Sequence, residues 1–84
     1  MSDEDYIVFV VDDDAAVREA LGELLASYGV TTMTFASAGA YMAAEKPRQP
    51  ACLILDVELP DINGLDLQRE IANHDHPPIL FITG

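Results

Sequence analysis

The hydrophobic pattern divides the chain into two kinds of segment that alternate along the sequence. Short strand-like segments, the first a continuous apolar run rich in β-branched residues, recur between longer segments with helical spacing. A continuous run of that kind is typical of a strand buried on both faces of a parallel sheet. The pattern therefore predicts four strands: YIVFVV (6–11), VTTMTF (30–35), ACLIL (51–55) and PPILFIT (77–83).

The segments between these strands predict three helices, at 13–28, 38–44 and 65–74. Gly29 after the first helix and Ser37 before the second are ordinary stop and start signals, and the prolines of KPRQP cannot continue a helix. The apolar positions at helical spacing are Val17, Leu21, Leu24, Leu25 and Tyr28 in the first helix and Leu65, Leu67 and Ile71 in the third.

The resulting order, strand and helix in alternation from one end to the other, indicates a single fold class. Strands separated by helices pair in parallel through right-handed crossovers, so we expect an α/β protein with a parallel sheet and helices on both faces. In sheets of this kind ligands bind outside the carboxyl ends of the strands. The residues that follow each strand are therefore the first place to look for chemistry.

Polar side chains follow three of the predicted strands. Asp12 and Asp13 come after the first, Asp56 after the third and Thr83 at the end of the fourth. Carboxylates that converge at one edge repel one another unless a cation offsets them, and Mg²⁺ prefers such oxygen ligands. A carboxylate can also act as a nucleophile and become an aspartyl phosphate, and Asp56 is the best placed candidate for that role.

Composition narrows the choice of partners. Fifteen acidic and four basic residues give a formal net charge of −11, which argues against non-specific binding to nucleic acid or to an anionic membrane. The single cysteine, Cys52, cannot form an internal disulfide, and no leader-like segment or membrane-length apolar run is present. A reducing cytoplasm is the compartment that we expect.

Three motifs occur in order on the predicted elements: the acid pair after the first strand, ILDVELPDING at 54–64, and FITG at 81–84. Together they resemble the phosphoacceptor receiver domain, the CheY-like domain of two-component response regulators. The sequences VELPDING and FITG look most like those of FixJ/NarL-type regulators, whose receiver is followed by a DNA-binding helix-turn-helix. The resemblance implies a flavodoxin-like sheet with strand order 2-1-3-4, and a signalling domain rather than an enzyme.

The resemblance also implies roles for individual residues. Asp56 would be phosphorylated by a histidine kinase, with Mg²⁺ held by Asp12, Asp13, Asp56 and the backbone carbonyl of Glu58. The remaining implied roles are a switch hydroxyl at Thr83, a small residue at Gly84 that leaves room for the phosphoryl group, loop geometry at Pro60 and Gly64, and a kinase contact patch at Ala16, Val17 and Ala20.

The chain ends at Gly84, about two-thirds of the way through the receiver pattern, before the last helix, strand and helix that the resemblance implies. The single lysine, Lys46, falls at the opposite end of the predicted sheet from the acid pair, so it cannot take the place of the family's phosphoryl-binding lysine. The segment ILFI would then be an open apolar edge, which favours pairing with another chain. We therefore expect either a truncation or a homodimer, formed through that edge or through the surface that the missing last helix would cover.

Simpler interpretations stand beside these. Asp14 is better interpreted as a helix-start residue than as a metal ligand, and Asp12 and Asp13 could themselves be only helix caps. Asp61 and Asn63 are interpreted as ordinary turn residues. His74 and His76 have a spacing that could bind a metal, but a solvated loop is the better interpretation.

Two other functions remain open at this stage. The first is a receiver-like interaction or dimerisation module that has lost phosphorylation, which the absent lysine favours. The second is a fragment of a haloacid-dehalogenase-like phosphotransferase, which also uses an aspartate nucleophile at a strand end. DVE is a poor match to the two aspartates expected there, and VVDDD has no place in that scheme.

Overall fold

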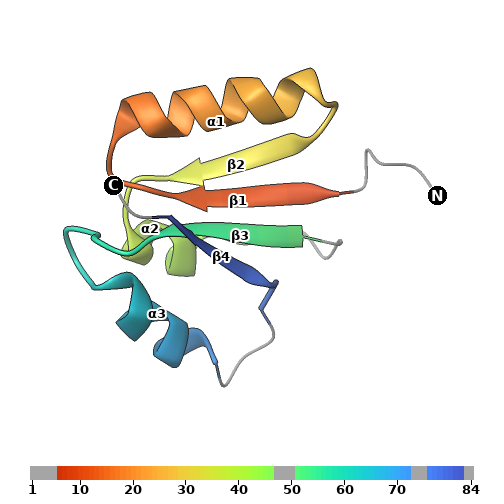
Figure 1. Cartoon of the computed structure of the whole chain (residues 1–84). Helices are drawn as coiled ribbons and strands as arrows, with labels where there is room; N and C mark the ends of the chain where they lie inside the picture. Colours follow the sequence, from red (N-terminus) through yellow and green to blue (C-terminus); the bar gives the residue numbers. More distant parts are fainter. Residues whose placement is uncertain (1–5, 47–50, 73–75, 83–84) are drawn as a thin grey trace.

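The computed structural model describes residues 6–46, 51–72 and 76–82, which form four strands and three helices in strict alternation (Figure 1). The strands are β1 (Ile7–Val11), β2 (Thr31–Phe35), β3 (Ala51–Asp56) and β4 (Ile79–Ile82), and the helices are α1 (Ala15–Ser27), α2 (Ala38–Ala43) and α3 (Gly64–Ile71). All seven predicted elements are confirmed. Their ends differ from the predicted limits by up to three residues: most are shorter than predicted, whereas β3 ends one residue later, at Asp56, and α3 begins one residue earlier, at Gly64.

The four strands form one parallel sheet in the order β2-β1-β3-β4, as predicted. Val11 at the end of β1 is in register with Phe35 of β2 and Leu55 of β3, and Leu55 is in register with Phe81 of β4. This register brings the carboxyl ends of the strands to one edge of the sheet. The residues that follow β1 and end β3 are therefore neighbours in space although they lie far apart in the sequence.

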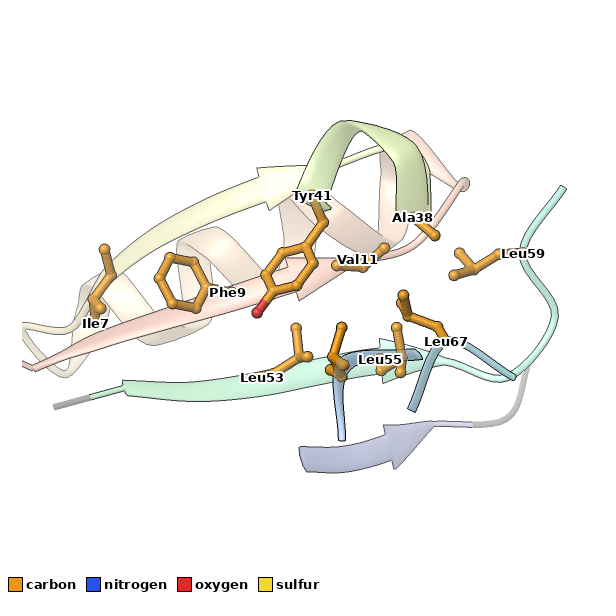
Figure 2. Close-up of a cluster of buried hydrophobic side chains, with 10 residues drawn as sticks. Ile7, Phe9, Val11, Ala38, Tyr41, Leu53, Leu55, Leu59 and Leu67 are labelled. Carbon is orange, nitrogen blue, oxygen red and sulfur yellow. The ribbon is translucent and has the colours of Figure 1, made fainter. Parts of the chain in front are cut away.

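Helices cover both faces of the sheet (Figure 1). One face carries α2 and α3, and its side chains form the buried core (Figure 2). The core comprises Ile7, Phe9, Val11, Ala38, Tyr41, Leu53, Leu55, Leu59, Leu67 and Ile71. Because side chains alternate along a strand, Val8 and Val10 point to the other face, where α1 packs against β1 and β2.

Three aromatic rings define the centre of the core. The Tyr41 ring of α2 lies edge-on to Phe9 of β1 and Phe35 of β2, with ring centroids 5.9 and 5.5 Å away. Edge-to-face pairs of this kind stabilise by roughly 0.5–1.5 kcal/mol beyond the burial of their area. The short helix α2 is therefore held on the sheet by the ring of Tyr41, together with the other buried residue of the helix, Ala38.

Two details of the predicted helix faces are wrong. Leu65 was expected to face the core, but it is 49% exposed, whereas Leu67 is fully buried. Two residues correspond to about 200° around a helix, so Leu65 and Leu67 point in nearly opposite directions, and α3 buries the Leu67 side. Leu24 and Tyr28 of α1 are also exposed, and no side chain of α1 is fully buried.

The exposure of Leu24 and Tyr28 follows from the way in which α1 packs on the sheet. A Cβ added to Gly22 would lie 3.5 Å from the hydroxyl oxygen of Thr32 in β2, an ordinary contact distance, so this side of α1 lies against β2. The helix is thus turned toward β2, and the Leu24 and Tyr28 side lies away from that contact. Gly29 then ends α1 with φ of 77°, a conformation that side chains other than glycine rarely adopt, as its position predicted.

None of the helices in the described parts of the chain is long and apolar enough to span a membrane.

Candidate functional site at the carboxyl edge of the sheet

Three aspartates meet where β1 and β3 end. Asp12, Asp13 and Asp56 each place a carboxylate oxygen within 4.8 Å of the other two. Asp12 and Asp56 are buried, at 5% and 7% exposure, whereas Asp13 is exposed. Two buried carboxylates and one exposed carboxylate give a compact cluster of hard oxygen donors, as the strand ends predicted.

The turn after β1 fixes Asp12 through its backbone and its side chain. Its backbone N–H donates to the carbonyl of Phe35 (3.1 Å), and its carbonyl accepts from Nη1 of Arg18 (2.7 Å). Its side-chain Oδ1 accepts from the N–H of Asp14 (2.8 Å). Asp14 in turn caps α1 by accepting from the N–H of Ala16 (2.9 Å), which confirms it as a helix-start residue.

The turn after β3 fixes Asp56 in a similar way. Oδ1 of Asp56 accepts from the N–H of Glu58 (3.0 Å), and the N–H of Val57 donates to the carbonyl of Ile82 in β4 (3.2 Å). The following loop, residues 57–63, is closed by an antiparallel bridge between Glu58 and Asn63. The side chain of Glu58 is exposed.

The cluster is electrostatically unfavourable in the absence of a cation. Burial raises the pKa of Asp12 above its ordinary value of 3.8, and the nearby carboxylates of Asp56, Asp13 and Asp14 raise it further. The hydrogen bond from the N–H of Asp14 opposes this by stabilising the charged form. A hard divalent cation would relieve the repulsion, and an all-oxygen donor set suits Mg²⁺. The residues present therefore fit that ion.

Other residues singled out in the sequence are placed as follows. Pro60 is exposed in the loop 57–63, and Gly64 is the first residue of α3. Ala16 and Ala20 are exposed on α1 and Val17 is half-buried there.

The predictions at Thr83, Gly84 and His74 lie outside the described residues. His76 is exposed, with Nδ1 2.8 Å from the carbonyl of Pro77, so its ring contacts its own loop.

Lys46 lies away from the acidic cluster. Its Nζ donates to the carbonyl of Ala44 (2.8 Å) and lies 4.5 Å from the centre of the Tyr41 ring. Both contacts are at the carboxyl end of α2, which runs back from the site toward the opposite edge of the sheet. The single lysine of this sequence is therefore held by α2 rather than directed toward Asp56.

Asp61 and Asn63 do more than the sequence interpretation gave them. Asn63 caps α3 by accepting from the N–H of Leu65 (2.8 Å), a role that its position before GLDL could have signalled. Asp61 accepts from two N–H groups of α2, those of Ala38 (3.2 Å) and Gly39 (2.9 Å). A contact across more than twenty residues leaves no local signal in the sequence.

A scan against protein families gives one match that covers nearly the whole chain, the response regulator receiver domain over residues 8–84. The chain belongs to the response regulator receiver family. The match favours the receiver interpretation over the haloacid-dehalogenase-like alternative.

Relatives of this receiver are response regulators. Response regulator protein TmoT of Ectopseudomonas mendocina is 42% identical over 85 residues, covering 100% of this chain and 39% of TmoT. Transcriptional regulatory protein FixJ of Azorhizobium caulinodans is 41% identical over 78 residues, covering 92% of this chain and 37% of FixJ. The chain thus spans about two-fifths of the length of these curated relatives.

A solved structure of the response regulator StyR has a TM-score of 0.86 and 44% identity, over 94% of this chain and 40% of that one. The crystal structure of FixJ-N has a TM-score of 0.84 and 34% identity, over 100% of this chain and 66% of that one. The similarity therefore extends from sequence to backbone, and includes the FixJ type that the motifs had suggested.

Proposed function

We propose that this receiver accepts a phosphoryl group on Asp56 from the phosphohistidine of a histidine kinase, in a reaction that depends on Mg²⁺. The observation that carries the proposal is the position of Asp56: its carboxylate ends β3, lies buried beside Asp12 and Asp13, and is oriented by the N–H of Glu58. Because Oδ1 accepts that bond, Oδ2 is the oxygen left for the new bond to phosphorus.

The chemistry is a single group transfer. A carboxylate oxygen of Asp56 forms a P–O bond while the P–N bond of the phosphohistidine breaks, and the displaced imidazole nitrogen takes a proton from solvent. Asp12, Asp13, Asp56 and the carbonyl of Glu58 would hold Mg²⁺, which when bound would neutralise charge on the phosphoryl oxygens. The rigid turn of Asp12 and the closed loop of Asp56 keep the acidic groups in position. Asp56 is a phosphoacceptor, so the domain is a signalling module rather than an enzyme for an external substrate.

The output of the whole protein is proposed from its relatives. TmoT is a response regulator and FixJ is a transcriptional regulator, and both are more than twice as long as this chain. We therefore propose regulation of transcription as the output. The strongly acidic receiver would not itself bind nucleic acid, since its net charge of −11 repels phosphate.

A second function is favoured by the position of Lys46, which is held at α2. In that case the segment would be an interaction module that keeps the fold without phosphorylation. The two are separated by incubating the protein with Mg²⁺ and a small phosphodonor and searching by mass spectrometry for an acid-stable, base-labile adduct. We expect an adduct on Asp56 that is lost in Asp56→Asn and retained in the control Asp66→Asn. Absence of both the adduct and Mg²⁺ binding would favour the interaction module.

A further inference from the structure

We propose that Asp61 is a positioning residue for the acidic site: it fixes the loop 57–63 against α2 and thereby sets the affinity for Mg²⁺ at Asp56. This inference rests on the proposed function, because it assigns a residue that supports the same site without touching the reacting atoms.

The contact is made by both carboxylate oxygens of Asp61. Oδ1 accepts from the N–H of Ala38 (3.2 Å) and Oδ2 from the N–H of Gly39 (2.9 Å). The first N–H groups of a helix have no partner within the helix, so Asp61 supplies acceptors that α2 itself lacks. The next N–H, that of Ala40, donates to the hydroxyl of Ser37 (3.1 Å). Local capping and long-range capping of α2 are therefore carried by different residues.

Apolar packing reinforces the same junction. Leu59, two residues before Asp61, is buried in the core together with Ala38, and Figure 2 shows the two side chains near one another. The loop is thus held to the start of α2 by a buried side chain and by a pair of hydrogen bonds. A turn residue needed only for the shape of its own loop would not require either contact.

The loop 57–63 connects the Asp61 contact to Asp56. Glu58 contacts Asp56 through its N–H and is bridged to Asn63, and Asp61 lies between these two bridge partners. Movement of residue 61 would therefore move Glu58, whose backbone N–H orients the carboxylate and whose carbonyl is proposed to face the metal.

The other end of the connection reaches Asp12. The N–H of Asp12 donates to the carbonyl of Phe35, and the chain passes from Phe35 through Ser37 directly into α2. Asp61 therefore closes a path from one half of the site to the other: Asp12 to the end of β2, then α2, then Asp61, then Glu58 and Asp56. Without it, the two halves would remain joined through the sheet, but the loop would lose its hydrogen bonds to α2 and keep only the packing of Leu59 beside Ala38.

The test compares four variants by calorimetric titration with MgCl₂ under conditions where each is folded. We expect Asp61→Ala to raise the dissociation constant for Mg²⁺ roughly tenfold, the size of effect seen when groups supporting metal ligands are removed. Asp61→Asn, which keeps one acceptor oxygen, should lie between Asp61→Ala and the wild type. Asp66→Ala removes the same charge from exposed α3 and should leave the affinity unchanged, which excludes a general charge effect.

Ser37→Ala is the matched structural control, because it removes a cap of α2 without touching the loop 57–63. We expect it to lower stability and to leave Mg²⁺ affinity unchanged. If Asp61→Ala and Asp61→Asn bind Mg²⁺ as the wild type does, or if Ser37→Ala weakens binding as much as Asp61→Ala, the positioning role is wrong while the proposed function stands. If the wild type neither binds Mg²⁺ nor forms the Asp56 adduct, the proposed function itself has failed, and this inference with it.

Discussion

Asp12 is the residue of the site at which burial and repulsion between carboxylates act together. It is buried, it faces two further carboxylates, and its backbone and Oδ1 are all engaged in hydrogen bonds. An asparagine would keep the oxygen that accepts from Asp14 and would remove the charge. The single substitution Asp12→Asn can therefore separate two effects: the destabilisation caused by repulsion among the carboxylates, and the contribution of Asp12 to cation binding.

We expect Asp12→Asn to be at least as stable as the wild type without Mg²⁺ at pH 7, because like-charge repulsion is removed. At Mg²⁺ about tenfold above its dissociation constant, the wild type should gain about 1.4 kcal/mol and the variant much less. For a domain of this size that gain shifts the melting temperature by roughly 6–11 °C. Thermal unfolding followed by circular dichroism checks both halves. An equal Mg²⁺ shift in the two proteins would contradict the assignment of Asp12 as a ligand.

Asp61 gives a second prediction at this scale, on stability against pH. Its hydrogen bond from the N–H of Gly39, with that from Ala38, lowers its pKa below the ordinary value of 3.8 despite partial desolvation. A lowered pKa in the folded state means that the stabilising contribution is present above pH 3.8 and is lost as pH falls through the lower folded value. The difference in urea midpoint between wild type and Asp61→Asn should be constant near neutrality and shrink in acid. A difference that widens in acid would contradict the sign.

The sequence predicted the acidic residues better than the residues that hold them. Asp12, Asp13 and Asp56 follow from a general rule about strand ends in parallel sheets, and Asp14 and Ser37 from local capping preferences. Asp61 was interpreted as a turn residue, since its partners in α2 lie more than twenty positions earlier. Contacts of that kind depend on how the elements meet, which periodicity does not encode.

At the scale of elements, α3 shows how narrow the buried face of a short helix is. Among the residues of α3 whose burial is described, 65–71, only Leu67 and Ile71, one turn apart, enter the core, and Leu65 is turned to solvent. The buried pair keeps α3 in place at the end of the loop that follows Asp56. The packing of Leu67 and Ile71 therefore helps to fix the far end of the loop 57–63, whose near end is Asp56.

Leu67 and Leu65 offer a matched test of this view. Leu67→Ala should destabilise the fold by roughly 2–5 kcal/mol, because it removes a fully buried side chain and leaves a cavity. Leu65→Ala should change stability by less than about 1 kcal/mol, since its side chain is half exposed and alanine favours helix. Urea unfolding of both variants measures the difference. Similar losses in the two would mean that α3 packs in another orientation.

Element type was predictable throughout, whereas element ends and helix faces were only partly so. Alternating blocks and glycine, serine and proline signals located all seven elements, and Gly29 and Ser37 marked helix limits correctly. The orientation of α1 was missed because it depends on which side of the helix packs against β2, here the side that carries Gly22, and this is a property of the helix–sheet pair. Apolar spacing alone assigned Leu24 and Tyr28 to the buried side.

At the scale of the whole described sheet, β2 and β4 are the outer strands, and they differ in character. β2 carries three threonines among its five residues, whereas β4 is ILFI, with Leu80 57% exposed. An apolar edge strand favours pairing with another chain unless something covers it. The edge formed by β4 is thus the surface where the predicted homodimer would form.

We expect the 84-residue chain to self-associate in sedimentation as its concentration rises, and Leu80→Lys to shift the distribution toward monomer, because a charge on an edge strand opposes pairing. Thr34→Lys on the opposite edge strand is the control and should leave association unchanged. A chain that stays monomeric at every concentration, or association unaffected by Leu80→Lys, would contradict pairing through β4.

The three hydrogen bonds that immobilise Asp12 also bear on the thermodynamics of cation capture. The order of this ligand is established when the chain folds, so little conformational entropy remains to be lost when an ion arrives. Rapid, reversible exchange of the ion would then require no rearrangement of the turn after β1. The start of α1 would be equally ordered with and without the cation, and a partner docking there would meet the same surface in both states.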